Sequence, residues 1–363
     1  MIAFVADVHL GNHRALAGQY VSRLNDRFRE TLRIFSTACH VAKKRGAQAL
    51  VVLGDLFDRD DPHPTMVSEV LQALQHGPDR AILLLGNHEM HSTQERDHAL
   101  ASMAGTWDGL QIDVIDSPTL VRVGDIGLCM VPYQPGNASE WLPGAVARTA
   151  MHPSDRALLC LHLGISDAET ETSQPWMMGC HDQIHVDALD ALISKHGLAG
   201  VAAGNWHRHM VWDGDAPIFQ TGALVPTGWN NAGGDEHYGT IGLWDGTAFE
   251  RLVLPGPRYV TFRSYDEWLP VAGNEQVRSR IVVPANRVSM TRERVDAEQP
   301  MGYVEVLADA STTQTRARQA AVAAQSAASD EDALIAYVGE MELPEGVTAS
   351  EVVERCRAYL QRA

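Results

Sequence analysis

The sequence lacks the features that mark membrane and secreted proteins. No stretch approaches the roughly 18 consecutive apolar residues that a membrane-spanning helix requires, so we expect a soluble protein with no membrane partner. The opening run Met1–Val5 is apolar, but no basic residue precedes it and no cleavage-like site follows it. The run therefore predicts a buried strand and not a signal peptide.

Cysteine is scarce and shows no pattern. The five cysteines, without any CxxC spacing, are Cys39, Cys129, Cys160, Cys180 and Cys356. An odd, unpatterned set indicates a reducing compartment and mostly buried thiols. We therefore expect a cytoplasmic protein.

Basic residues are also in short supply. The chain has 29 Lys and Arg against 46 Asp and Glu, a formal net charge of −17, whereas strong nonspecific nucleic-acid binders usually carry a positive surface. Carboxylates that hold divalent metal ions present less net charge to a ligand. One stretch is locally basic, because Arg278–Arg294 contains five arginines against the single Glu293. It is either a solvated edge strand and loop or a binding face.

The chain does contain enough apolar sequence for a substantial core. At 363 residues with 45% hydrophobic residues, it is long enough for one large domain with an appendage or for two domains. Short apolar runs alternate with helical patterns, which predicts an α/β core with mainly buried strands. The expected strands begin the segments 2–9, 49–55, 81–89, 157–164 and 198–207, and the expected helices lie in 24–39, from 64 onward and in 186–193.

The pattern changes in the second half of the chain. Runs of β-branched and aromatic residues at 216–227 and 238–255, the second with an Asp-Gly turn, predict antiparallel strands that close the domain. A boundary near Pro257–Trp268 gives a domain of residues 1–262 and a second domain of residues 263–363. The elements expected in the second domain are a strand at 302–309, an Ala/Gln-rich helix at 316–328 and a last helix that begins at the capping box of Thr348 and Glu351.

Five of the expected strands end in residues with oxygen or imidazole donors. The donors are Asp7 and His9, Asp55 and Asp58, Asn87 and His88, His162, and Asn205 and His207. Loops at the carboxyl ends of strands in an α/β sheet meet in one crevice, so residues remote in sequence converge there. A mixture of carboxylate, amide and imidazole without thiolate suits Mn, Fe or Zn. We therefore predict a metal site at these strand ends.

These strand ends carry five motifs in a fixed order. They are D-x-H at 7–9, G-D-x-x-D at 54–58, G-N-H-E at 86–89, a single histidine at 162 and G-x-x-H at 204–207. The set, over about Ile2–Phe262, resembles the signature of the calcineurin-like metallophosphoesterases. That resemblance implies an α/β fold, a β-sandwich flanked by helices, here with a small α+β carboxyl-terminal cap domain. The segments "ADVHLG" and "GDLFD" further resemble the nuclease subunit of bacterial and phage SbcCD-type complexes that process DNA ends.

The resemblance also implies a role for each motif residue. Two divalent metal ions are implied, Mn²⁺ first, with Fe, Zn or Mg as alternatives. One ion would be held by Asp7, His9 and His207, the other by Asn87, His162 and Asn205, with Asp55 bridging them. His88 would give a proton to the leaving group of a phosphoester, and Asp58 would orient His88. Gly54 and Gly86 fit the close backbone approach that such a site requires.

One motif departs from the family pattern. Where the family usually has Gly-His-x-His, this chain has Gly204-Asn205-Trp206-His207-Arg208-His209. Asn205 can coordinate through its amide oxygen, although more weakly than an imidazole. A second alignment uses His207 and His209 as the pair and leaves Asn205 out. Near the ligand loops, His13, Arg14 and His91 either touch the substrate phosphate or are ordinary surface residues.

The predicted reaction is phosphoester hydrolysis, and the resemblance favours DNA as substrate. It implies an exonuclease or endonuclease subunit with an SbcC-type SMC-like ATPase as partner, and a homodimer. The terminal amphipathic helix ending at Leu360 either docks that partner or packs within its own domain. The alternative is a metallophosphatase or phosphodiesterase acting on small molecules or phosphoproteins. A third interpretation, a scaffold without catalysis, is opposed by the presence of His88.

Overall fold

The computed structural model describes residues 1–13, 20–21, 24–92, 97–149, 157–167, 183–214, 216–226, 239–274, 277–300, 302–309 and residue 353. The chain divides into two compact units. The first is Met1–Val260 with Glu275–Arg278, and the second is Thr261–Asn274 with Ser279–Ala363.

The first unit is built on two β-sheets. The seven-stranded sheet has, in order, β17 (Phe249–Val253), β16 (Thr240–Trp244), β1 (Ile2–Val5), β4 (Leu50–Leu53), β5 (Arg80–Leu84), β7 (Leu110–Ile115) and β6 (Gly105–Trp107). The six-stranded sheet has β14 (Met210–Trp212), β15 (Ile218–Gln220), β13 (Gly200–Gly204), β10 (Ala157–His162), β9 (Ile126–Val131) and β8 (Thr119–Val123). Neighbours from β1 through β4 and β5 to β7, and from β9 through β10 and β13 to β15, run parallel. Their carboxyl ends therefore lie at one edge of each sheet.

Side chains of successive strand residues alternate between two cores. In β1, Ile2 and Phe4 belong to the core between the sheets, and Ala3 and Val5 belong to the core under the helices. In β10, Leu158 and Cys160 lie in the core shared with β1, whereas Leu159 and Leu161 lie in the core on the outer side. The two sheets therefore pack face to face as a β-sandwich, because a strand buried on both faces is apolar at every position.

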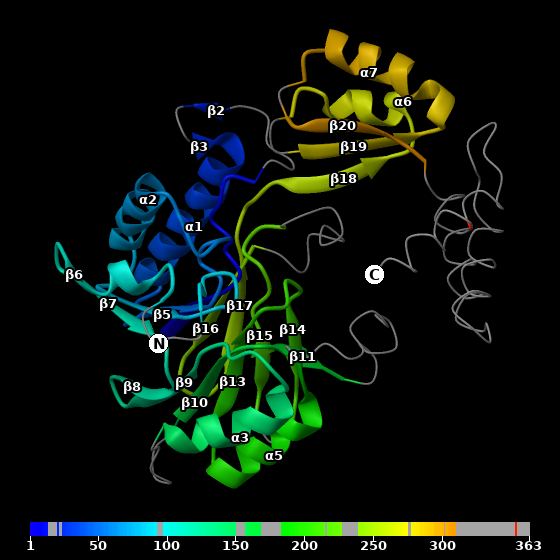
Figure 1. Ribbon diagram of the computed structural model, residues 1–363. Helices are drawn as coiled ribbons and strands as arrows, with labels where there is room; N and C mark the ends of the chain where they lie inside the picture. The colour runs from blue at the N-terminus through cyan, green and yellow to red at the C-terminus, as the bar shows by residue number, and fades with distance from the viewer. Residues whose placement is uncertain are drawn as a thin grey trace. The chain divides into compact units, whose positions relative to one another are not determined.

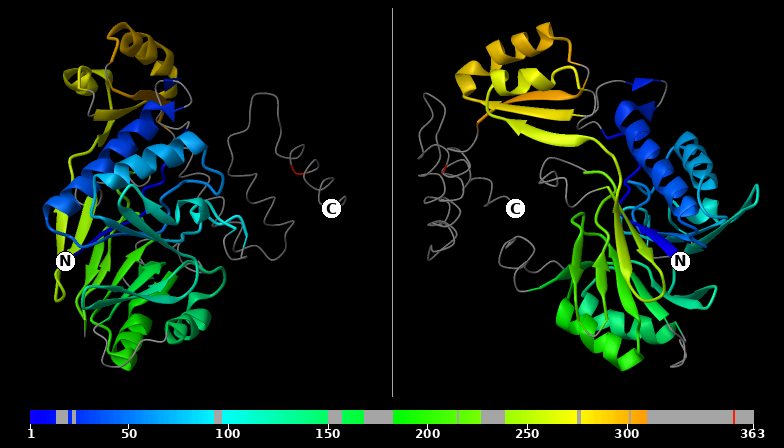
Figure 2. Two further views of the ribbon diagram at one scale, coloured as in Figure 1. Left: turned by 90° about the vertical axis from the view of Figure 1, so that its left-hand side faces the viewer. Right: turned by 180° about the vertical axis from the view of Figure 1, so that it is seen from behind.

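Helices cover both outer faces of this sandwich. α1 (Asp26–Lys44) and α2 (Pro64–Gln75) pack on the seven-stranded sheet, and α3 (Ala138–Arg148) and α5 (Val186–His196) pack on the six-stranded sheet (Figure 1). Figure 2 shows the same layers from two further sides. The predicted fold class, an α/β β-sandwich flanked by helices, is confirmed.

The helix ends follow local chemistry. The Asn25 side chain accepts a hydrogen bond from the amide of Phe28 and caps α1, and His63 caps α2 ahead of Pro64 in the first turn. Gly197, at φ 63°, ends α5 in the left-handed conformation that glycine tolerates. The predicted helices from 24, 64 and 186 are present. α3 was not predicted from the sequence.

The antiparallel strands predicted at 238–255 are present, whereas the strand in the run at 216–227, β15, is parallel to β13 and antiparallel only to β14. β16 and β17 form a hairpin whose turn contains Asp245 and Gly246, with Gly246 at φ 106°. The remaining short elements of this unit are β2 (Tyr20–Val21), β3 (Leu24–Asn25), β11 (Gly164–Ser166), β12 (Gln183–His185) and the 3₁₀ turn η1 (Ala101–Met103). Within the described ranges, no helix has the length and apolar character needed to cross a membrane.

The second unit has a small α+β core. Its sheet has the order β18 (Arg258–Phe262), β19 (Val277–Val283) and β20 (Val304–Ala308), with α6 (Tyr265–Trp268), α7 (Val288–Ala297), η4 (Leu269–Val271) and η5 (Ala285–Arg287). Trp268, Ile281 and Val295 are buried together. The predicted strand at 302–309 appears as β20. The helix predicted at 316–328 lies outside the described residues, and so does the helix predicted from Thr348 except for the buried Val353.

The basic stretch Arg278–Arg294 is neither an edge strand nor a loop. It begins in β19, the central strand of its sheet, and ends in α7. Its side chains are used within the chain, because Arg278 pairs with Glu30, Arg280 with Glu305, and Arg294 with Asp266 while lying over the Tyr265 ring. The interpretation as a solvated edge strand is therefore wrong.

Candidate metal centre

Backbone hydrogen bonds join the loops that follow β1 and β4. The amide of Asp7 donates to the carbonyl of Gly54 (3.2 Å), and the amide of His9 donates to the carbonyl of Asp55 (2.9 Å). The two motifs therefore run side by side beyond the ends of their parallel strands. This pairing places Asp7, His9 and Asp55 in one crevice.

The backbone at the crevice is strained. In the described part of the chain six non-glycine residues have positive φ, and four of them are Asp7 (49°), His9 (49°), Asp55 (52°) and Asn205 (81°). A non-glycine residue in this region costs on the order of 1–3 kcal/mol and persists only where its surroundings enforce it. The concentration of such residues at four predicted site positions points to a functional site.

Two glycines make room for the site. A Cβ on Gly54, which has φ 87°, would overlap the His162 ring, and a Cβ on Gly86 would overlap Oδ1 and the amide nitrogen of Asp55. The close approach expected at both glycines is therefore observed. His162 and Asp55 can occupy the crevice because these two positions lack side chains.

A first cluster of ligand atoms comes from Asp7, His9 and His207. Nε2 of His9 and Nε2 of His207 are 3.0 Å apart. Burial, and then the nearby His9, lower the pKa of His207 to about 3. For His9, burial favours the neutral ring, but Asp58, Asp55 and Asp7 outweigh it and raise the pKa.

A second cluster comes from Asp7, Asp55 and His162, and Asn87 adjoins it. His162 donates from Nδ1 to the carbonyl of Leu53 (2.7 Å), so its Nε2 faces Oδ1 of Asn87 at 3.0 Å and Oδ2 of Asp55 at 3.4 Å. Burial opposes a charge on His162, yet Asp55 raises its pKa to about 9. Burial alone would raise the pKa of Asp55, but His162 and other histidines lower it.

Asp55 lies between the two clusters. Its Oδ2 is 3.7 Å from Nε2 of His9 and 3.4 Å from Nε2 of His162. Its Oδ1 accepts a hydrogen bond from the amide of His88 (3.1 Å). One carboxylate at 1% exposure thus reaches both histidine clusters and the loop after β5.

The ligand atoms fit divalent cations. Nδ1 of His162 donates to Leu53, so Nε2 is the nitrogen that faces the oxygens of Asn87 and Asp55. Without a metal a second ring proton satisfies these oxygens, in line with the raised pKa, and a cation bound to Nε2 would take the place of that proton. Nε2 of His9 and Nε2 of His207 are a hydrogen-bond distance apart, 3.0 Å, so both nitrogens point at one position and could bind one cation together. Carboxylate, amide and imidazole donors suit Mn, Fe or Zn.

His88 sits at the rim of the crevice with its side chain 41% exposed. Its Nδ1 donates to the main-chain carbonyl of Asp58 (3.1 Å), and its Nε2 is 3.9 Å from Oδ2 of Asp55. The Asp58 carboxylate lies near three rings, 3.6 Å from Nδ1 of His9, 3.5 Å from Nδ1 of His13 and 3.9 Å from Nδ1 of His88. The residue expected to orient His88 therefore makes its hydrogen bond to it through the main-chain carbonyl, with its carboxylate at a longer distance.

Asn205 and His209 are placed differently. The amide of Asn205 donates to both carboxylate oxygens of Asp7, at 2.9 and 3.1 Å. The buried His209 pairs through Nδ1 with the carbonyl of Gln220 (2.9 Å) and packs edge-on against Phe219. His207 belongs to a cluster of ligand atoms with Asp7 and His9, and His209 belongs to none of the clusters found among the described residues, which favours the alignment that uses Asn205 and His207.

Glu89 is a site residue whose role the sequence analysis missed. Its fully buried carboxylate accepts hydrogen bonds from the amide of Phe57 (3.0 Å) and from the amide of Gly86 (3.0 Å). Burial, and then Asp55, raise its pKa to about 7. Glu89 therefore ties the loop after β4 to the loop after β5. Its place in G-N-H-E was the only signal in the sequence.

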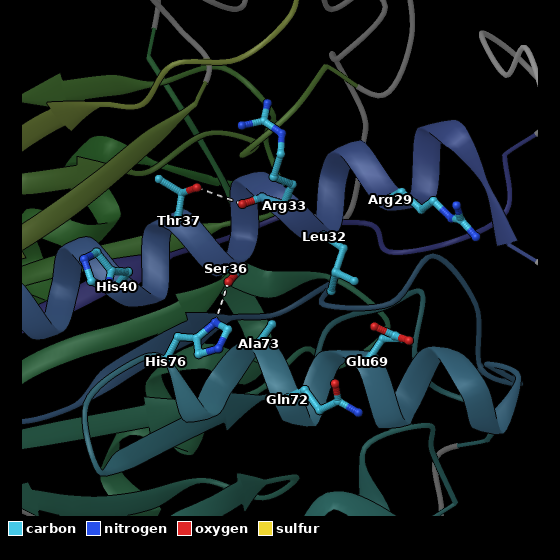
Figure 3. Close-up of a pocket in the computed structure, with 10 residues that line it drawn as sticks. All are labelled: Arg29, Leu32, Arg33, Ser36, Thr37, His40, Glu69, Gln72, Ala73 and His76. Carbon is cyan, nitrogen blue, oxygen red and sulfur yellow. Dashed lines mark hydrogen bonds between the residues drawn. The ribbon is translucent and has the colours of Figure 1, made fainter. Parts of the chain in front are cut away.

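A separate groove lies between α1 and α2, away from the strand ends (Figure 3). Residues of α1, among them Arg29 and Leu32, line one side of it and Glu69 and Gln72 of α2 line the other, and Ser36 bonds to His76 (2.8 Å). None of the predicted site residues lines this groove.

The fold and the crevice together define a metal-dependent hydrolase built on a helix-flanked β-sandwich. The family model of the calcineurin-like phosphoesterases matches residues 1–215, and the chain belongs to this family. It is therefore a phosphoesterase of a family that uses divalent metal ions. No curated protein sequence matches the chain.

The solved structures that are similar to the chain include two hydrolases. The phosphopantetheinyl hydrolase PptH from Mycobacterium tuberculosis is 12% identical with a TM-score of 0.37, and the match covers 61% of this chain and 89% of that one. A dimetal phosphatase from Danio rerio is 12% identical with a TM-score of 0.42, covering 69% of this chain and 98% of that one. Neither likeness bears on the substrate.

Proposed function

We propose that the protein is a two-metal-dependent phosphodiesterase, a nuclease subunit that acts on DNA ends in repair or recombination. The proposal of two metal ions rests on the position of Asp55. Its Oδ2 lies 3.7 Å from Nε2 of His9 and 3.4 Å from Nε2 of His162. A carboxylate so placed would bridge one cation held by Asp7, His9 and His207 and another held by Asn87, His162 and Asn205.

Bound divalent cations would supply the charge that polarises the phosphoryl oxygens and lowers the pKa of water. Mn²⁺ suits this donor set, with Fe, Zn or Mg as alternatives. In hydrolysis the oxygen of water bonds to phosphorus, the bond from phosphorus to the leaving oxygen breaks, and the leaving oxygen takes a proton. His88 would give that proton from Nε2, with its ring held by Asp58, and would regain one from the attacking water.

DNA as the substrate is supported by sequence resemblance. The segments "ADVHLG" and "GDLFD" and the region of about a hundred residues after the family domain are the features shared with SbcD-type nucleases. Arg278, Arg280 and Arg294 pair with acidic residues of the chain, so the proposal does not depend on that stretch. An acidic protein would bind DNA weakly alone. We therefore also propose an SbcC-type ATPase partner, a homodimer and a cytoplasmic location.

The test offers four substrates to the purified protein with Mn²⁺: linear duplex DNA, single-stranded DNA, bis(p-nitrophenyl) phosphate and p-nitrophenyl phosphate. We expect metal-dependent cleavage of DNA and of the diester, with little turnover of the monoester. His88→Ala should lower kcat by about 10²–10⁴ without weakening Mn²⁺ binding in calorimetry. The matched control is His40→Ala, which removes an exposed histidine of α1. Rapid monoester hydrolysis with DNA left intact would favour the metallophosphatase.

A further inference from the structure

His13 lies beside the candidate metal centre, in the loop after β1. Its side chain is only 18% exposed, so it is not an ordinary surface residue. Nε2 of His13 lies 2.9 Å from the carbonyl oxygen of His9. Because a carbonyl oxygen only accepts hydrogen bonds, Nε2 carries a proton and is the donor. The ring is therefore bonded to the backbone of a predicted metal ligand.

With this bond, both peptide groups of His9 are hydrogen-bonded. The amide of His9 donates to the carbonyl of Asp55 (2.9 Å), and the carbonyl of His9 accepts from His13. His9 needs this restraint because its φ of 49° is unfavourable for a residue with a side chain and persists only where the surroundings enforce it. Fixing both peptide groups fixes the direction of the Cα–Cβ bond, and with it the course of the His9 ring toward Nε2 of His207.

A second, longer contact joins His13 to the same ring through Asp58. Nδ1 of His13 is 3.5 Å from Oδ2 of Asp58, and Oδ1 of Asp58 is 3.6 Å from Nδ1 of His9. Gly11 allows the two loops to come this close, since a Cβ at position 11 would lie 2.8 Å from Cβ of Asp58. Both distances at Asp58 exceed those of an ordinary hydrogen bond. The bond from His13 to the carbonyl of His9 is therefore the stronger restraint.

His13 is itself anchored at the start of α1. Asn25, the N-cap residue of α1, donates from Nδ2 to the carbonyl of His13 (2.7 Å), and the amide of Asn25 donates to Oδ1 of Asn12 (3.0 Å). Asn25 is fully buried, and its Oδ1 accepts from the amide of Phe28. His13 thus links a buried helix end to the strained loop that carries His9.

We propose that His13 is a positioning residue of the metal centre, whose Nε2 holds the peptide group of His9 so that the His9 ring meets the first cation. This rests on the first metal site of the proposed function and does not depend on the substrate. Groups that orient a ligand without touching the metal typically change metal affinity by about 10–100-fold when they are removed. His13 acts through His9 and not on the substrate phosphate.

Three substitutions of His13 separate its contacts. His13→Ala removes both contacts. The amide nitrogen of a glutamine can reach the position of Nε2 of a histidine, and that of an asparagine only the position of Nδ1. His13→Gln therefore keeps a donor for the carbonyl of His9, and His13→Asn keeps only a polar group near Asp58. His76→Ala, which removes the imidazole bonded to Ser36 in the groove of Figure 3, is the matched control.

Mn²⁺ binding by each protein is measured by titration calorimetry, and the melting temperature in EDTA shows whether each variant folds. We expect His13→Ala and His13→Asn to bind Mn²⁺ about tenfold more weakly than the wild type. His13→Gln and His76→Ala should keep the affinity of the wild type. Equal losses for His13→Gln and His13→Asn, or no loss for His13→Ala, would overturn the assignment. If His13→Ala does not fold, the comparison of His13→Gln with His13→Asn decides.

A double-variant cycle tests whether His13 acts through His9. If it does, His13→Ala should cost no further Mn²⁺ affinity once His9→Ala has removed the ring. Additive losses would give His13 a general structural role and overturn the proposal.

Failure of the proposed function gives a different result. If the wild type binds Mn²⁺ but cleaves no diester, the proposed function fails, and the calorimetric comparison still decides the role of His13. If the wild type binds no Mn²⁺, the role of His13 is overturned together with the metal centre.

Discussion

Nε2 of His9 and Nε2 of His207 are 3.0 Å apart, although 198 positions separate the two residues in the chain. His9 follows β1 of the seven-stranded sheet, and His207 follows β13 of the six-stranded sheet. The contact therefore joins the two layers of the sandwich at their open edge. A cation bound there would stabilise the packing of the sheets as well as serve the reaction, because a ligand that binds only the folded state raises its stability.

Asn205→His should tighten the second metal site. An imidazole binds first-row divalent ions more strongly than an amide oxygen, and histidine, like asparagine, tolerates the positive φ of 81° at this position. The amide of residue 205 would still donate to Asp7. We expect Mn²⁺ affinity to rise about tenfold, or about 1.4 kcal/mol, in titration calorimetry.

The control for Asn205→His is Arg208→His, which adds an imidazole at an exposed position of the same loop. It should leave Mn²⁺ affinity unchanged. Unchanged or weaker binding by Asn205→His would show that the side chain of residue 205 is not directed at a metal.

Glu89→Gln should destabilise the protein and weaken metal binding together. The glutamine amide group would face one of the two backbone amides, Phe57 or Gly86, that now donate to the carboxylate. A buried donor left unsatisfied costs about 1–3 kcal/mol, which urea denaturation in EDTA would measure. The freed loop after β4 carries Asp55, so Mn²⁺ affinity should fall as well.

Glu69→Gln, which makes the same change on α2 at the groove of Figure 3, is the control for Glu89. It should alter neither stability nor affinity measurably. Loss of stability in Glu89→Gln with Mn²⁺ affinity intact would limit Glu89 to a structural role.

The convergence of Asp7, Asp55 and His162 was predictable because apolar runs locate strand ends, and ends of parallel strands meet at one edge. The role of Glu89 was not predictable in this way, since its partners are backbone amides that any sequence carries. The orientation of Asp58 depends on which nearby rings its carboxylate reaches, and strand position does not specify that. His209 was left as an alternative because its distance from the other ligand atoms depends on tertiary structure, which places His207 and not His209 with Asp7 and His9.

α3 (Ala138–Arg148) shows a similar limit for secondary structure. Pro143 and Gly144 stand in its interior, and both residues have low helix propensity. Leu142, Ala145 and Val146 are nevertheless buried against the six-stranded sheet. Packing on the sheet outweighs the low helix propensity of these residues, so the local sequence does not predict this helix.

Gly86→Ala should abolish metal binding at a position that contacts no metal itself. The added Cβ would overlap both Oδ1 and the main-chain nitrogen of Asp55, and a backbone atom cannot move aside cheaply. We expect a loss of about 1–3 kcal/mol in stability from overpacking and no Mn²⁺-dependent rise in melting temperature. Gly144→Ala in α3, where the nearest atom is a flexible arginine tip, should be tolerated. Normal Mn²⁺ stabilisation of Gly86→Ala would contradict the close packing at Asp55.

The stability of the metal-free protein should fall as pH rises from about 4 to about 7. Burial raises the pKa of Asp7 from 3.8 to about 6 and that of Glu89 from 4.5 to about 7 in the folded state. The folded protein therefore holds these protons more tightly than the unfolded chain, and their contribution is lost as each group ionises. Asp7→Asn cannot ionise. In EDTA, the free energy of unfolding of Asp7→Asn should therefore rise relative to that of the wild type by on the order of 2 kcal/mol between about pH 4 and about pH 7.

Urea denaturation at several pH values measures this difference, with exposed Asp296→Asn as the control that should track the wild type. Mn²⁺ should reverse the trend for the wild type only, because the ligands must release protons before they bind a cation and Asp7→Asn has lost a charged ligand. If the free energy of unfolding changed with pH in the same way for Asp7→Asn and the wild type in EDTA, the Asp7 carboxyl would have the same pKa in the folded and unfolded chain. Burial of Asp7 would then not be the reason that a cation is favoured at this end of β1.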